Sequence, residues 1–238
     1  RIVIVGLIHN GNKHLNHQTL YKAIKQVQPA VILWEYSKPF KRAWGLFTAK
    51  RLQIVRPSIE QLALQQYSRK YSHVPVLGFD TTIASRKQYL KEWISVRQVF
   101  FDSLFVASKS AADSSSCAHY QQRHQQYYQL IDTSTLSSMN AADVVARGRE
   151  LFQLEETVLV PLGHQYISNK TLVTQFQQQL SYWKLRNNHM VQQISSYATQ
   201  YPGATILVLT GLNHKYYLWD QLPLQFKSQN QAIELRNH

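Results

Sequence analysis

Two copies of one short pattern contain the residues that are best suited to chemistry. The sequence GLIH at 6–9 ends in His9, and GLNH at 211–214 ends in His214. Each copy follows a continuous apolar run, IVIV at 2–5 and ILVL at 206–209. Such runs are typical of strands that are buried on both faces of a parallel α/β sheet. We therefore expect both histidines at strand ends, where an imidazole can bind a ligand or transfer a proton.

Two carboxylates follow the next two predicted strands. The run at 31–34 is followed by Glu35, and the run at 76–79 by Asp80. The carboxyl ends of parallel strands meet at one edge of the sheet, and ligands bind in the crevice beyond it. We therefore predict that the side chains of His9, Glu35 and His214 lie within about 10 Å of a common point.

The longest predicted helix covers residues 171–199. Its apolar residues recur at three- and four-residue steps, which is the spacing of one buried helix face. They are Val173, Phe176, Leu180, Trp183, Met190 and Ile194. Asn187 interrupts this stripe, and an unsatisfied buried amide costs on the order of 1–3 kcal/mol, so Asn187 needs partners.

Arg186 precedes Asn187, and His189 lies on the same edge of the helix. One interpretation is that Arg186 and Asn187 only tie the helix to carbonyl groups at the strand ends. The other is that Arg186 is largely buried, bonds Glu35 or Asp80 and holds a substrate oxygen. In that case Asp80, Asn187 and His189 are the candidate substrate-binding residues.

These motifs together resemble the TraB/Tiki superfamily, whose members include erythromycin esterases, ChaN-like haem-binding lipoproteins and Tiki proteases. The matching features are the two Gly-x-x-His strand ends, the strand that ends in Glu35, and the segment RNNHM at 186–190. The resemblance covers residues 1–36 and 172–222. It implies His9, Glu35, Arg186 and His214 as the catalytic set. Leu185 stands where relatives often carry an acidic residue, which leaves the particular activity open.

The resemblance implies hydrolysis of ester or amide bonds, with a small molecule or a peptide as substrate. Two mechanisms fit. His9, Glu35 and His214 could bind a divalent metal, zinc or manganese, with one position left for water. Alternatively, a histidine oriented by Glu35 acts as general base while Arg186 stabilises the oxyanion. The second is slightly favoured, because Arg186 and Glu35 already supply charge and orientation. The alternative function is non-catalytic binding of haem or another small ligand.

The composition limits the partners of the protein. The chain of 238 residues has a formal net charge of +13. Its densest basic cluster follows Glu35 and consists of Lys38, Lys41, Arg42, Lys50, Arg51 and Arg56. We interpret this cluster as a solvated surface, with attraction for an anionic ligand as the alternative. The sequence contains no recognisable nucleic-acid-binding motif, so a nucleic-acid partner is disfavoured.

Other residues set limits on chemistry and location. Cys117 is the only cysteine, which excludes an intrachain disulfide and a cysteine-based zinc site. No apolar run approaches the ~20 residues that span a bilayer. Because the chain starts at Arg1, directly before a strand, we expect residues upstream of it. Whether the protein is cytoplasmic or exported stays open, as does its oligomeric state.

The expected fold is one α/β domain over residues 1–238, with a mostly parallel sheet flanked by helices and a helical middle segment at about 86–160. Helices are predicted at 17–27, 86–107, 118–131 and 141–154, with another starting at Ser58. The small residues at 108–116 predict a break between helices, and His164 is expected in a turn. A basic, aromatic segment around Trp44 is expected to cap the crevice.

His119 and His124 lie in a predicted helix that is rich in tyrosine and glutamine. Histidine and tyrosine side chains can ligate haem iron, so haem is a conceivable cofactor here. We interpret these two histidines as ordinary packing or surface residues.

Overall fold

A computed structural model describes residues 1–9, 12–36, 57–81, 86–108, 111–228 and 234–237. The basic cluster and the aromatic segment predicted after Glu35 lie outside these residues. The chain divides into two compact units, one made of residues 1–82, 130–145 and 187–238, the other of 83–129 and 146–186. The boundary between them falls inside three helices, at 129/130, 145/146 and 186/187. That the two units form a single domain stays a prediction.

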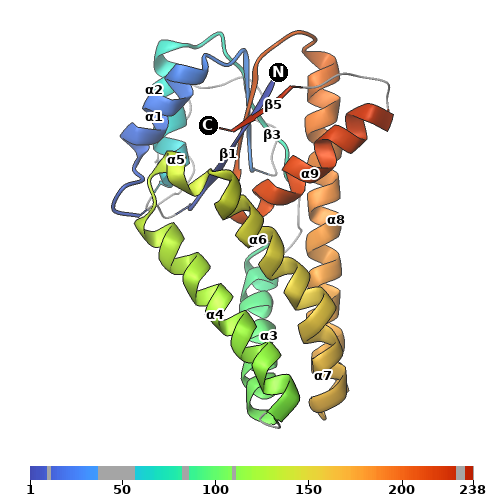
Figure 1. Cartoon of the computed structure of the whole chain (residues 1–238). Coiled ribbons are helices and arrows are strands. Elements are labelled where there is room, and N and C mark those ends of the chain that lie inside the picture. Colours follow the sequence, from blue (N-terminus) through green and yellow to red (C-terminus); the bar gives the residue numbers. More distant parts are fainter. Residues whose placement is uncertain (10–11, 37–56, 82–85, 109–110, 229–233, 238) are drawn as a thin grey trace. The chain divides into compact units, whose positions relative to one another are not determined.

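The first unit contains a parallel sheet of five strands in the order β3-β2-β4-β1-β5 (Figure 1). The strands are β1 (Ile2–Leu7), β2 (Val31–Trp34), β3 (Val76–Gly78), β4 (Ile206–Gly211) and β5 (Leu235–Asn237). All the pairings are parallel, which confirms the predicted α/β class. The central strand β4 lies between β1 and β2, with Leu7 opposite Gly211 and Trp34 opposite Leu209. The chain ends that carry the predicted site residues therefore leave the sheet at one edge.

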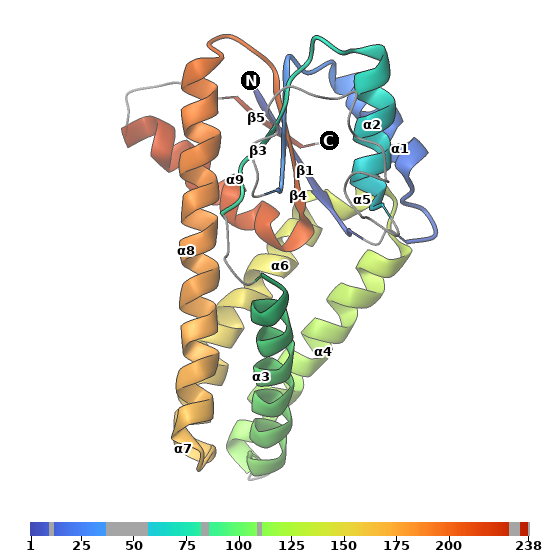
Figure 2. The same ribbon diagram turned by 180° about the vertical axis from the view of Figure 1, so that it is seen from behind.

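Helices cover both faces of this sheet. They are α1 (His17–Val27), α2 (Ile59–Lys70), α5 (Leu136–Met139), α9 (Leu212–Ser228) and the C-terminal part of α8 (Lys170–Gln200). In Figures 1 and 2, α1 and α2 lie on one side of the strands, and α8 and α9 lie on the other. The predicted α8 stripe packs there, because Met190 and Ile194 share one buried cluster with Ile4, Leu33 and Val208.

Local sequence signals explain where these helices begin. The side chain of Asn16 accepts hydrogen bonds from two backbone N–H groups of the first turn of α1. Ser58 and Gln61 form a capping box at the start of α2, as the polar residue before that apolar pattern predicts. The acidic residue Glu60 therefore lies in the first turn of α2.

The second unit is helical and has its own core. Its elements are α3 (Arg86–Ala107), parts of α4 (Ala111–Thr133), α6 (Ala142–Leu154) and α8, the π-helical turn η2 (Glu155–Leu159), and α7 (Val160–Tyr166). The rings of Phe100 and Phe176 stack with their centroids 3.9 Å apart. Arg97 donates two hydrogen bonds to the buried carboxylate of Glu155, which also accepts one from Tyr120. Burial is the main cause that raises the pKa of Tyr120.

Two predictions about the helical segment need correction. Helix α3 ends at Ala107, where the predicted break at 108–116 begins, but α4 already starts at Ala111, so the break is shorter than predicted. Alanine is the strongest helix former and serine is tolerated, so the residues at 111–116 can belong to a helix. His164 lies in α7 and not in a turn, because Pro161 occupies the first turn of that helix, where proline is tolerated.

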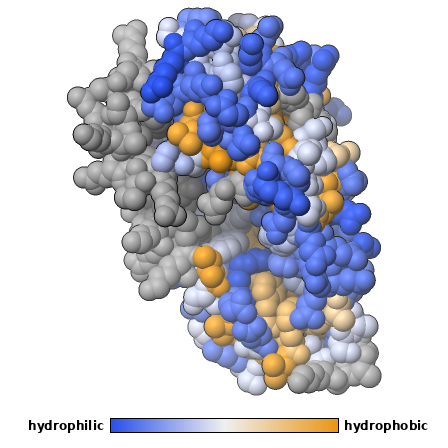
Figure 3. Space-filling model, turned by 90° about the vertical axis from the view of Figure 1, so that its left-hand side faces the viewer, coloured by the Kyte–Doolittle hydropathy of each residue, from blue (hydrophilic) through white to orange (hydrophobic). Residues whose placement is uncertain are grey.

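On the face that Figure 3 shows, hydrophobic residues form small patches among hydrophilic ones. In the second unit, α3 exposes Ile94, Val99 and Val106. No helix within the described ranges combines the length and the apolar character needed to cross a membrane. Cys117 is buried, and its sulfur accepts a hydrogen bond from the hydroxyl of Ser108.

Candidate functional site

Adjacent strand ends bring three of the predicted residues together. Glu35 directly follows β2, and its backbone N–H donates to Leu209 O at 3.0 Å, which extends the pairing of β2 with β4. His9 lies two residues beyond β1, and His214 lies in the first turn of α9, which continues directly from β4. Because these three strands are neighbours, residues far apart in sequence meet at one edge of the sheet.

Glu35 is at the centre of the cluster. Its Oε2 atom accepts hydrogen bonds from Gly211 N at 2.5 Å and from Thr210 Oγ1 at 3.0 Å. Its Oε1 atom lies 3.6 Å from His214 Nε2 and 3.9 Å from His9 Nε2. These distances confirm the prediction that His9, Glu35 and His214 converge. The anchored oxygen fixes the carboxylate so that its other oxygen faces both imidazoles.

His214 is buried and held by Asn187. The distance between His214 Nδ1 and Asn187 Oδ1 is 2.7 Å, and Asn187 is fully buried. An amide oxygen only accepts hydrogen bonds, so Nδ1 of His214 carries the proton and Nε2 faces Glu35. The polar interruption of the α8 stripe thus supports an imidazole at the site.

His9 is the exposed imidazole of the cluster. Its side chain is 51% exposed, whereas the side chains of Glu35 and His214 are 2% and 8% exposed. Its Nδ1 atom lies 2.7 Å from Oε1 of Glu60, a carboxylate that is almost fully buried. The sequence analysis did not single out Glu60. Because its side chain is half exposed, His9 is the histidine of the cluster that a molecule from solution can reach.

Gly211 provides the space in which these groups meet. A Cβ atom at this position would lie 3.2 Å from His9 Nε2, 3.3 Å from Glu35 Oε2 and 3.5 Å from His214 Cδ2. Gly211 therefore has two roles: its backbone N–H donates to Glu35, and its lack of a side chain leaves room for the two imidazoles. This explains why the second Gly-x-x-His pattern begins with glycine.

The proposed metal ligands were tested against this geometry. Among the residues that the structure describes, no three His, Cys, Asp or Glu side chains are arranged to hold a metal ion. The Nδ1 atoms of His9 and His214 are used by Glu60 and Asn187, and one oxygen of Glu35 is used by Gly211. These hydrogen bonds use Nδ1 of the histidines and Oε2 of Glu35, whereas both Nε2 atoms face Oε1 of Glu35. Metal binding by His9, Glu35 and His214 stays a prediction.

A second buried polar group supports the first Gly-x-x-His segment. The side-chain amide of Asn140 accepts from Gly6 N at 2.7 Å and donates to Gly6 O at 3.0 Å, as a neighbouring strand would. Lys215 is fully buried and donates to Asn140 Oδ1 at 2.5 Å. Its removal from water lowers the pKa of Lys215 to about 7. The sequence analysis missed both residues.

The other predicted site residues are Asp80, Arg186 and His189. Asp80 is buried, and its Oδ1 atom accepts a hydrogen bond from the backbone N–H of Thr81 at 2.7 Å. His189 is half-buried on α8. Arg186 is also half-buried and is the last residue of the second unit, directly before Asn187. The substrate-binding role of Asp80, Asn187 and His189, and the catalytic role of Arg186, stay predictions.

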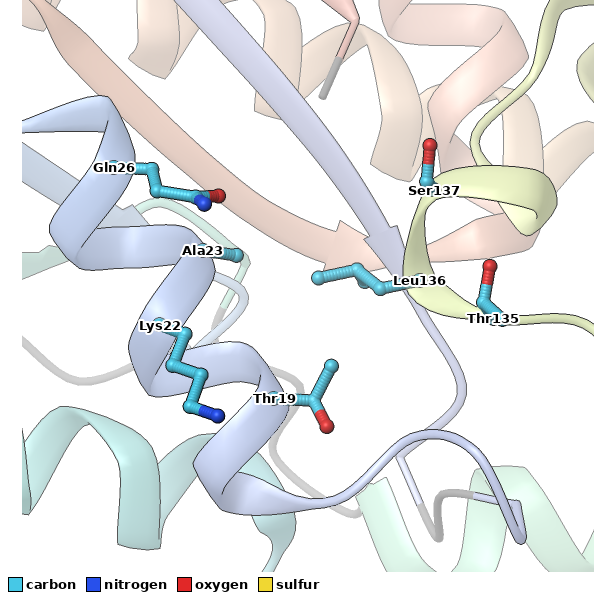
Figure 4. A pocket seen from close by; sticks show the side chains of 7 residues that line it. All are labelled: Thr19, Lys22, Ala23, Gln26, Thr135, Leu136 and Ser137. Atoms are coloured by element: carbon cyan, nitrogen blue, oxygen red, sulfur yellow. The ribbon is translucent and has the colours of Figure 1, made fainter.

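A separate pocket of about 360 Å³ lies between α1 and α5 (Figure 4). Its lining residues are Thr19, Lys22, Ala23, Gln26, Thr135, Leu136 and Ser137. None of the residues of the strand-end cluster lines this pocket. This pocket and the candidate chemistry are therefore at different places in the first unit.

Comparison with known proteins finds one distant similarity of structure. The chain is similar to a mutant of the erythromycin esterase EreC in its open conformation, with 10% sequence identity and a TM-score of 0.32. The similarity covers 89% of this chain and 60% of the esterase chain. No protein-family model matches the sequence. No curated protein matches it either.

Proposed function

We propose that the protein is a hydrolase of ester or amide bonds in which His9 is the general base. The observation that carries this proposal is the position of His9, an exposed imidazole whose Nε2 atom lies 3.9 Å from a buried, anchored carboxylate. Such an imidazole can remove a proton from water near neutral pH, and the carboxylate stabilises the imidazolium that forms.

In the proposed reaction, an O–H bond of water breaks and its proton moves to His9 Nε2. The water oxygen bonds the carbonyl carbon of the substrate, and the carbonyl electrons move to its oxygen. When the tetrahedral intermediate collapses, the proton on His9 passes to the leaving alkoxide or amine. Glu35 stabilises the protonated His9, and Arg186 is the candidate donor to the oxyanion.

His214 has a supporting role in this proposal. It is buried and tied to Asn187, and its Nε2 atom lies 3.6 Å from the same oxygen of Glu35 that faces His9. It therefore packs against the oxygen of Glu35 that Gly211 does not anchor and limits where that oxygen can lie. Loss of His214 is expected to lower activity through the position of Glu35 and not through direct contact with substrate.

A panel of chromogenic p-nitrophenyl esters and p-nitroanilides tests the function. We expect wild-type protein to hydrolyse at least one of them, and His9→Asn to lower kcat by about 100-fold or more, the typical contribution of a general base. His14→Asn is the matched control, because His14 is an exposed histidine in the segment that follows β1. It is expected to leave the rate unchanged.

The alternative function makes a different prediction. Added haem would produce a Soret band, and no member of the panel would be hydrolysed. That combination would replace the hydrolase by a ligand-binding protein. Equal rates for wild-type and His9→Asn protein would also contradict the role of His9.

A further inference from the structure

Glu60 is a buried carboxylate that is only half satisfied. It is 1% exposed. One oxygen contacts His9 Nδ1 at 2.7 Å, whereas the other, Oε2, is buried without a hydrogen-bond partner among the described residues. A buried carboxylate oxygen without a partner destabilises a fold. The stability of the fold alone therefore does not explain an acidic residue at this position.

The place of Glu60 in α2 leads to the same conclusion. Glu60 lies on the stripe formed by Ala63, Leu64 and Tyr67, all of which are buried. An apolar side chain would fill that position without leaving an unsatisfied charge. The interaction that remains to account for Glu60 is its hydrogen bond to His9.

We propose that Glu60 is a positioning residue that holds His9 in the tautomer with its proton on Nδ1. A carboxylate accepts hydrogen bonds and cannot donate them, so the nitrogen 2.7 Å away must be the one that carries hydrogen. The lone pair is then on Nε2, the nitrogen that faces Glu35. This proposal rests on the proposed function, since it supplies the base that the hydrolysis needs.

The two histidines are oriented in the same way by different groups. Glu60 accepts from Nδ1 of His9, and Asn187 accepts from Nδ1 of His214. The Nδ1 partner is a carboxylate for His9 and a neutral amide for His214, and the side chain of His9 is 51% exposed against 8% for His214. A charged partner stabilises an imidazolium, whereas a neutral amide stabilises mainly an orientation. The carboxylate of Glu60 thus contacts Nδ1 of His9, the histidine that gains a proton in the proposed reaction.

Long-range 1H–15N NMR of 15N-labelled protein tests the proposal without any substrate. Spectra are recorded about two pH units above the ordinary imidazole pKa, where neutral tautomers dominate. The absence of one set of signals from His9→Asn assigns His9. Wild-type protein is expected to show His9 with the proton on Nδ1, and Glu60→Met to show it mainly on Nε2. The thermal midpoint of Glu60→Met is expected to equal or exceed that of wild type.

Glu60→Gln provides a second variant, in case the methionine variant does not fold, because glutamine has the shape of glutamate without its charge. It is expected to keep the fold while the hydrolytic kcat falls about tenfold or more with little change in KM, because the charge behind the base is lost. Glu150→Gln is the matched control, since it removes a carboxylate from the surface of the second unit, where it pairs with Arg123. It is expected to leave the tautomer of His9 unchanged.

A proton on Nε2 of His9 in wild-type protein would overturn the proposal. So would an unchanged tautomer in Glu60→Met, whatever its stability. If wild-type protein hydrolyses no ester or amide, the proposed function fails, but the tautomer still tests Glu60. If the tautomer shifts in Glu60→Met and the full hydrolytic rate remains, the positioning role is wrong and the hydrolase proposal stands.

Discussion

The backbone N–H of Gly211 donates to Glu35 Oε2 at 2.5 Å, and the same residue leaves the space in which two imidazoles approach that carboxylate. The first residue of the second Gly-x-x-His pattern thus sets the position of a carboxylate that follows a different strand. This relationship explains how two motifs at the two ends of the chain act on one group.

Replacement of Gly211 by alanine is expected to disturb the cluster directly. The added Cβ would lie 3.2 Å from His9 Nε2 and 3.3 Å from Glu35 Oε2, distances at which the side chains must move. We expect Gly211→Ala to lower kcat by about tenfold or more, because misplaced catalytic groups lose efficiency steeply. Gly203→Ala, in the turn after α8, is the control for kcat. An unchanged kcat in Gly211→Ala would contradict the described geometry.

Asn187 and its neighbour Asn188 offer a matched pair of substitutions. Asn187 is fully buried and accepts from His214, whereas Asn188 is exposed and accepts from Tyr217. Asn187→Leu should lower the free energy of unfolding by about 1–3 kcal/mol, because a buried imidazole N–H loses its acceptor. Asn188→Leu should change it by less than about 1 kcal/mol. Urea unfolding of both variants measures the difference, and equal effects would contradict the role of Asn187.

Lys215 makes the stability of the protein depend on pH. Burial lowers its pKa from 10.5 to about 7 in the folded protein, so the unfolded chain binds more protons between these values. Stability therefore increases as the pH rises through this range, by at most about 1.4 kcal/mol per pH unit from this group. Below about pH 7 the full penalty is present.

Lys215→Met tests this pH dependence, because methionine fills similar space and does not titrate. Urea unfolding of both proteins between pH 7 and pH 10 is expected to show that wild type gains stability relative to the variant as the pH rises. A constant difference across the range would show that the pKa of Lys215 is not lowered. A difference that changes in the opposite direction would contradict the sign of the effect.

Arg186 is tested through activity. If its guanidinium stabilises the oxyanion, Arg186→Ala should lower kcat by about 100- to 1,000-fold, the range found when one such donor is removed. Arg186→Lys should restore only part of the rate, since an ammonium group lacks the planar pair of donors. Lys184→Ala is the control, because that cation lies two residues earlier in α8 and pairs with Glu156. Full activity of Arg186→Ala would assign Arg186 a structural role.

Much of the fold could be predicted from the sequence because each strong local signal agrees with its tertiary setting. The apolar run at 31–34 is strand β2, and the periodic segments at 17–27 and 86–107 are helices α1 and α3 with the predicted bounds. The edge strand β5 was not predicted, because three residues are too few for a periodic signal. The break predicted at 108–116 exists but is shorter, because α3 ends at Ala107 and the small residues from Ala111 onward are already part of α4.

The supporting residues of the site were missed although a signal for them exists. Asn187 was noticed because it interrupts an apolar helical stripe. Glu60 interrupts a similar stripe in α2, and Lys215 lies between Leu212 and Leu218 in α9. The same criterion applied to every helix would have selected all three. Asn140 gives no such signal, because its role depends on contact with a strand more than a hundred residues away.

The central claim is that His9 is the base and that it acts without a metal. Its most direct test is the rate of hydrolysis by wild-type and His9→Asn protein, both measured after exhaustive chelation. We predict that wild-type protein keeps its rate and loses it only on acidification, as the imidazole is protonated, whereas His9→Asn falls to background. Loss of wild-type activity on chelation with recovery on adding zinc or manganese, or a full rate in His9→Asn, would contradict the claim.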